Sequence, residues 1–167
     1  MKSIIASSLP LLSLLVMAPA LPAGQLTRDA LQKQNISLLQ RVEDTANDVV
    51  STAERIESYN RVPNEYSREC HMYQLDALKE QINAMTHDLD RLAMTRNGLD
   101  TADRRAIERV LTVAVELAHS ANQTIVEANR MDATPGLSVE YRKLASDCYR
   151  QSEMLVKALS SCIEELK

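Results

Sequence analysis

The sequence predicts an all-α protein, an antiparallel up-down-up-down four-helix bundle that follows a cleaved signal peptide. Three observations support this fold class. Apolar residues recur with alternating spacings of four and three along four long segments, which is the spacing of one helical face. Glycine and proline are confined to the start of the chain and to short stretches between those segments. No segment alternates apolar and polar residues for long enough to predict a strand.

The beginning of the chain has the pattern of a signal peptide. Lys2 gives a positive start, and an uncharged, mostly apolar run follows. Small residues precede two expected cleavage sites, after Ala20 or after Ala23. The run is short and interrupted by prolines, so it does not predict a membrane span. We therefore expect residues 1–23 to be removed on export, and residues 24–167 to form one bundle domain that is periplasmic or secreted, without membrane insertion.

The composition argues against nucleic-acid binding and predicts the kind of core that the protein has. The formal net charge is −4, and it becomes −5 when Lys2 is removed with the leader. Proteins that bind nucleic acids carry a clustered basic surface, so we expect no nucleic-acid partner. The chain has no tryptophan and no phenylalanine, so its core must be built from aliphatic side chains. Such a core suits the packing of helix on helix.

The first helix is expected from about Thr27, a residue type that caps helices, to Tyr59. Its two seam rows, each with a period of seven, are Leu31, Leu38, Thr45, Thr52 and Tyr59, and Asn35, Val42, Val49 and Ile56. Further apolar residues lie beside them, which is typical of a broad core face or of a helix that touches two neighbours, one of them another chain. The second helix follows Pro63 and is expected to end near Asn97, with Gly98 as a left-handed stop. We place its start at about Asn64.

The third helix is expected to start after Asp100 or Thr101, either of which can cap it. Its seam rows are widened by Leu111, Ala118 and Ile125. A Thr-Pro-Gly sequence at residues 134–136 ends this pattern. The fourth helix is expected to start after Ser138.

Four amphipathic helices joined by short connections favour an antiparallel bundle. Its expected core residues are Leu38, Val49, Leu78, Ile82, Leu89, Leu117 and Leu155. The same regular spacing is compatible with a homodimer that completes its core between two chains.

The expected topology gathers tyrosine at one end of the bundle. That end holds the end of the first and third helices and the start of the second and fourth. The candidate binding residues there are Tyr59, Tyr66, Met72, Tyr73, Met131, Tyr141 and Tyr149. Tyrosine suits partner surfaces, but it also suits bundle ends, with its ring packed and its hydroxyl wet. Both interpretations stay open at this stage.

Three cysteines in an exported chain suggest one disulfide and one remaining thiol. Cys148 and Cys162 are separated by about 21 Å of helical rise, so they cannot bridge within an intact helix. Cys70 is expected near the level of Cys148, which predicts a Cys70–Cys148 disulfide unless the second and fourth helices are diagonal. Cys162 is then a buried thiol or an intermolecular link.

The motifs of catalysis and metal binding are incomplete. A metal or haem site near Cys70, His71 and Cys148 is an alternative function, but the chain has no C-x-x-C or H-x-x-x-H spacing. One Glu-x-x-His motif, from Glu116 to His119, has no second copy. A nucleophile elbow and a phosphate loop are also absent. We therefore expect no catalytic residues, no resident metal and no cofactor, and we expect an interaction module whose partner is an envelope or extracellular protein.

Overall fold

The computed structural model describes residues 28–131, 135 and 138–167. Its helices are α1 (Arg28–Arg61), α2 (Arg68–Thr95), the short 3-10 helix η1 (Arg96–Gly98), α3 (Thr101–Asn129) and α4 (Val139–Glu165). The described part of the chain contains no strand. The prediction of an all-helical protein with four long helices is therefore confirmed for these residues. The expected signal peptide, residues 1–23, and the start of the bundle domain lie outside the described residues.

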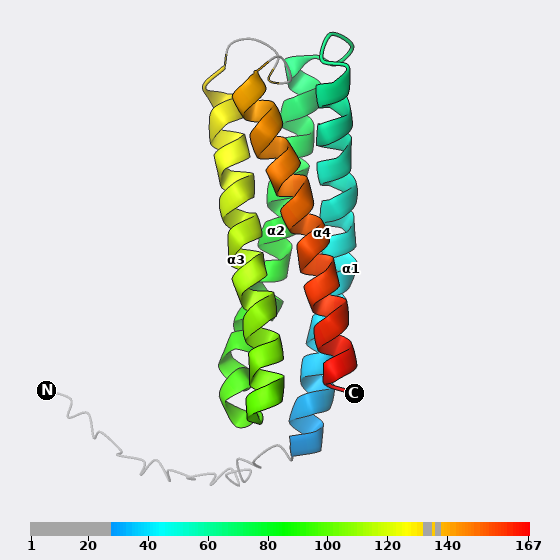
Figure 1. The fold of residues 1–167 in the computed structure, drawn as a ribbon, viewed down its shortest axis with the longest axis vertical. Coiled ribbons are helices and arrows are strands. Elements are labelled where there is room, and N and C mark those ends of the chain that lie inside the picture. Colours follow the sequence, from blue (N-terminus) through cyan, green and yellow to red (C-terminus); the bar gives the residue numbers. More distant parts are fainter. Residues whose placement is uncertain (1–27, 132–134, 136–137) are drawn as a thin grey trace, which may run out of the picture.

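The four long helices lie side by side along one axis (Figure 1). The chain ascends through α1, returns through α2, ascends through α3 and returns through α4. An ion pair joins the first part of α1 to the second half of α2: the Arg41 guanidinium lies 2.9 Å from the Asp88 carboxylate. Each long helix packs mainly on two others, so α1 is diagonal to α3 and α2 is diagonal to α4.

Polar side chains fix the starts of three helices. Asp100 accepts hydrogen bonds from the backbone N–H groups of Ala102 and Asp103 and so caps α3. Ser138 caps α4 in the same way. Both starts agree with the sequence prediction. The second helix begins later than predicted, because Ser67 is its cap and a turn precedes it.

The core is continuous and mostly aliphatic, and it also contains Tyr141, Cys148 and Cys162. Five of the seven expected core residues are fully buried: Leu38, Val49, Leu78, Leu117 and Leu155. The other two, Ile82 and Leu89, pack against the core but are only partly buried. Their exposure follows from the arrangement of the helices, because α2 and α3 pack less closely than the other neighbouring pairs.

Of the polar residues predicted in the seam of the first helix, Asn35 and Thr52 are buried, and Thr45 is partly buried. Asn35 is fully buried, and its Oδ1 accepts a hydrogen bond from the Thr95 hydroxyl at 2.7 Å. Helix α1 packs against both α2 and α4, and its additional apolar residues Leu39, Ala46 and Ala53 are buried in the core. Intramolecular packing thus accounts for the wide apolar stripe of this helix.

Gly98 differs from its prediction. We expected it to stop the second helix in the left-handed conformation, but its φ is not positive, and it lies in η1. A Cβ atom at this position would meet the Leu31 Cδ2 atom at 2.8 Å. The absence of a side chain at Gly98 therefore allows α1 to pack closely against η1.

Replacing Gly98 by alanine is expected to change the free energy of unfolding by less than about 0.5 kcal/mol. The lower backbone entropy of the unfolded variant stabilises it, and the shift of the flexible end of Leu31 offsets that gain. Urea unfolding of the two proteins measures the difference. A loss of about 1–2 kcal/mol would instead indicate a left-handed residue at this position.

Candidate functional site

A histidine lies among three tyrosines near the end of the bundle where α2 and α4 begin. The rings of Tyr59 and Tyr66 stack with their centroids 3.9 Å apart. The His71 ring contacts two tyrosine rings edge-on. Its centroid lies 5.5 Å from that of Tyr59 and 5.6 Å from that of Tyr141. The His71 Nδ1 atom and the Tyr141 hydroxyl are 3.3 Å apart, which is within hydrogen-bond distance. This cluster joins α1, α2 and α4.

Burial shifts the pKa values of two residues of this cluster, His71 and Tyr141. His71 and Tyr141 are both fully buried. Burial lowers the pKa of His71 below its ordinary value, because the charged imidazolium loses its hydration. Burial, with a smaller effect of Cys148, raises the pKa of Tyr141 well above its ordinary value. The His71 Nε2 atom is buried and has no hydrogen-bond partner in the described structure. Both pKa shifts favour the neutral forms of His71 and Tyr141.

The structure divides the seven predicted binding residues. Tyr141 is buried and cannot contact a partner, which corrects its assignment to the surface. Tyr59 and Tyr66 are partly buried against each other. The Tyr149 hydroxyl donates to Glu153 at 3.2 Å within α4. Tyr73, by contrast, is 72% exposed.

The two methionines of the predicted set are packing residues. Met72 and Met131 are partly buried against the core. The carbonyl oxygen of Met131 accepts a hydrogen bond from Arg68 Nε at 3.1 Å, which joins the end of α3 to the start of α2. The predicted binding set is therefore mixed, because Tyr141 is buried, Tyr73 is exposed, and the other residues of the set are partly buried.

The expected disulfide is absent. All three cysteines are free: Cys70 is exposed, whereas Cys148 and Cys162 are buried. Cys70 lies in the exposed first turn of α2, and Cys148 faces the core from the diagonal helix α4. The predicted Cys70–Cys148 bridge is wrong for this structure because the diagonal arrangement separates the two helices. Burial raises the pKa of each of the two buried thiols to about 12.

We expect a thiol reagent such as DTNB to modify one cysteine rapidly in the native protein and three after denaturation. Thiolate is the reactive form, and Cys148 and Cys162 are both buried and held as thiols. A Cys70→Ser variant should lose the rapid phase. If the unreduced native protein lacks a rapid phase and releases fewer than three thiols on denaturation, Cys70 is bridged.

The alternative metal or haem site was expected near Cys70, His71 and Cys148, and the structure does not bring these three side chains together as a ligand group. Across residues 28–131, 135 and 138–167, no group of three or more His, Cys, Asp or Glu side chains could hold a metal ion. His71 instead faces Tyr141, and Cys70 points away from the core. Glu116 and His119 are both exposed on α3.

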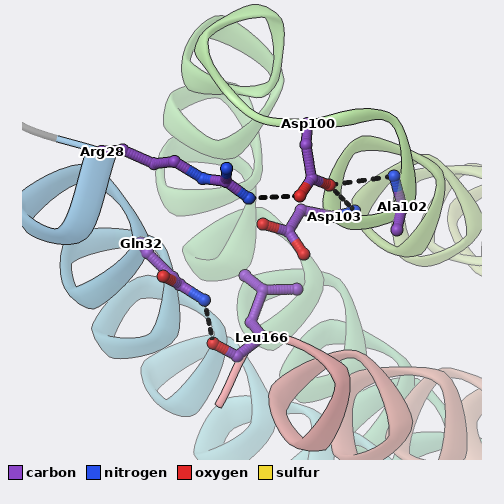
Figure 2. Close-up of polar contacts among 6 residues, drawn as sticks. All are labelled: Arg28, Gln32, Asp100, Ala102, Asp103 and Leu166. Carbon is purple, nitrogen blue, oxygen red and sulfur yellow. Dashed lines mark hydrogen bonds and ion pairs between the residues drawn. The ribbon is translucent and has the colours of Figure 1, made fainter.

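The opposite end of the bundle is held by polar contacts (Figure 2). Arg28, at the start of α1, forms an ion pair with Asp100, the cap of α3. Gln32 donates a hydrogen bond to the carbonyl oxygen of Leu166 beyond α4. Asp103 is buried beside Asp100, and its pKa is raised mainly by burial and further by that neighbouring carboxylate. These contacts tie the start of α1, the start of α3 and the end of α4 together.

An apolar groove with a volume of about 370 Å³ lies between α2 and α3, and we call it the α2–α3 groove. It is lined by Ile82, Met85, Thr86, Leu89, Asp90, Ala93, Leu111, Ala114, Val115 and Ala118. Val115 is 70% exposed. This groove was not among the sites predicted from the sequence. Its signal was the third apolar row of the third helix, which extends beyond the two rows needed for the core.

Comparison with family models, with curated proteins and with solved structures finds no match to this chain. Within the described residues, no helix has the length and apolar character needed to cross a membrane.

Proposed function

We propose that this protein is an exported, non-enzymatic antiparallel bundle that binds another protein of the envelope or the extracellular space. The observation that carries the proposal is the α2–α3 groove. Here, two neighbouring helices leave apolar side chains, including Ile82, Leu89 and Val115, incompletely covered. An apolar groove between two helices offers surface that a helix of a partner protein can cover.

The groove supports binding better than the tyrosine end does. A partner helix gains apolar contact by entering a hydrophobic groove between two helices. At the tyrosine end, Tyr141 is buried and Tyr59 already stacks on Tyr66, so little ring surface is left for a partner. Tyr73 remains the exposed aromatic residue of that set. We therefore place the partner along α2 and α3.

A matched pair of surface variants tests this function. Val115 and Val139 are 70% and 73% exposed, but only Val115 lines the groove. Partners are recovered from the envelope or medium of the producing cells with the wild type, Val115→Gln and Val139→Gln. We expect Val115→Gln to reduce recovery at least about fivefold, because a buried valine contributes substantially to an apolar interface. Equal recovery with both variants would remove the groove from the binding surface.

Export has its own test. N-terminal sequencing of the protein outside the cytoplasm should find Leu21 or Gly24 as the first residue, because signal peptidase cuts after small residues such as Ala20 and Ala23. A chain that keeps Met1 would contradict the proposed cleavage.

A further inference from the structure

Three carboxylates lie in or beside the α2–α3 groove. Asp90 lines the groove itself, and Glu108 and Glu116 line a hollow that continues from it along α3. All three residues are exposed. The ion pairs found among the described residues do not include them. Arg96 lines the continuing hollow, but no cation lines the groove itself.

The groove between α3 and α4 has a different charge. It is lined by Arg105, Arg109 and Lys157, with Glu108 as its acidic residue. Arg109 is already paired with Glu165 at 2.6 Å. Glu108 therefore lies at the border of both grooves, and Glu116 also lines a hollow on the α4 side of α3 that holds Arg150. Asp90 is the carboxylate that lines the α2–α3 groove itself, where no cation is among the lining residues.

The apolar residues of the α2–α3 groove are arranged in two short rows. Ile82 and Leu89 form one row on α2, and Leu111 and Ala118 form the other on α3. Residues seven apart on a helix are separated by about 10 Å of rise. That length matches two turns of a third helix, which would present side chains at positions i, i+4 and i+7. The small Ala114 and Ala118 side chains allow such a helix to approach closely.

We propose that the α2–α3 groove binds an amphipathic helix of the partner protein, with lysine or arginine on both sides of its apolar stripe. This inference rests on the proposed function and specifies the chemistry of the partner. The apolar stripe covers the groove, and the flanking cations meet Asp90, Glu108 and Glu116. Such charge complementarity fixes the orientation of the bound helix and excludes acidic competitors.

Three synthetic helical peptides with the same leucine stripe test the proposal. Their flanking positions carry lysine, glutamine or glutamate, and binding is measured by fluorescence anisotropy at 0.15 M salt. We expect the Kd of the lysine peptide to be about tenfold lower than that of the glutamine peptide, because each exposed ion pair contributes a factor of roughly two to five. The glutamate peptide should bind most weakly. Equal binding of the lysine and glutamine peptides would overturn the basic requirement and leave the groove as a docking site.

A pair of charge-swapped variants distinguishes the effect of the carboxylates at the groove on peptide binding from the effect of the protein's net charge. Asp90→Lys with Glu116→Lys should reverse the order of the lysine and glutamate peptides. Asp44→Lys with Glu140→Lys makes the same change in net charge at exposed acids outside the groove, and it should preserve the order. Circular dichroism verifies that both variants fold. The same response in both variants would overturn the proposal.

The apolar part of the groove is tested separately. Val115→Gln should raise the Kd of the lysine peptide, whereas Val139→Gln should not. If Val115→Gln leaves the Kd unchanged, the groove itself is wrong as the binding surface, and the proposed function fails with it. Analytical sedimentation of the wild type tests whether a second copy of this chain occupies the groove instead of a partner helix. A stable dimer that Val115→Gln dissociates would identify a second copy in the groove and overturn the proposal.

Discussion

Replacing Leu78 by alanine is expected to lower the free energy of unfolding by about 2–5 kcal/mol, whereas the same change at Leu89 should cost about 1 kcal/mol. Leu78 is fully buried in the core, so its truncation removes apolar contacts and leaves a cavity. Leu89 lies on the same helix but borders the α2–α3 groove, where it is only partly buried. Solvent can reach the space that its truncation opens.

Chemical denaturation of the two variants measures this difference. The comparison is controlled, because both positions are leucines of α2 and the substitution is the same. Equal losses of several kcal/mol would show that Leu89 is covered in solution. That result would contradict the open groove on which the proposed function depends.

Acidification from pH 7.5 to pH 5.5 is expected to destabilise the protein through His71. Burial lowers the pKa of His71 in the folded protein, so the unfolded chain binds a proton more readily than the folded chain does. The resulting stabilisation is fully present above the unfolded pKa of about 6.5, and it declines as the pH falls from there toward the folded pKa. The slope reaches at most about 1.4 kcal/mol per pH unit.

Urea unfolding at a series of pH values measures the effect, and His71→Asn provides the reference. Asparagine places a polar atom near the Tyr141 hydroxyl and cannot take up a proton. The pH dependence between pH 7.5 and 5.5 should therefore be shallower in the variant. His87 and His119 are exposed and are common to both proteins. Identical slopes would exclude His71 as the source of the acid sensitivity.

The helical fold was predictable because its signals are local. The period of the apolar residues and the cap residues Asp100 and Ser138 each act within a few residues of the chain. The start of α2 was placed too early because a proline was used as the boundary, whereas Ser67 supplies the cap. Gly98 was assigned to a left-handed turn from its residue type, but the close approach of Leu31 decides its role.

The site was less predictable because it depends on how the helices pair. Sequence periodicity shows which residues share a face, but not how tightly each neighbouring pair of helices packs. Ile82 and Leu89 follow the same pattern as Leu78, yet the looser contact of α2 with α3 leaves them at a groove. The same limitation applies to the tyrosines, because their common end is a matter of topology and the burial of Tyr141 is a matter of packing.

The sequence by itself determined the class of fold, the number of long helices and most of the aliphatic core, since these follow from residue spacing and helix capping. Only the tertiary structure decided the diagonal placement of α2 and α4, which separates Cys70 from Cys148 and leaves all three thiols free. It also decided that α2 and α3 meet loosely, so that apolar residues remain beside unpaired carboxylates. Distances between segments far apart in the chain depend on how the side chains of all four helices fill one core. The local spacing of apolar residues does not determine that packing.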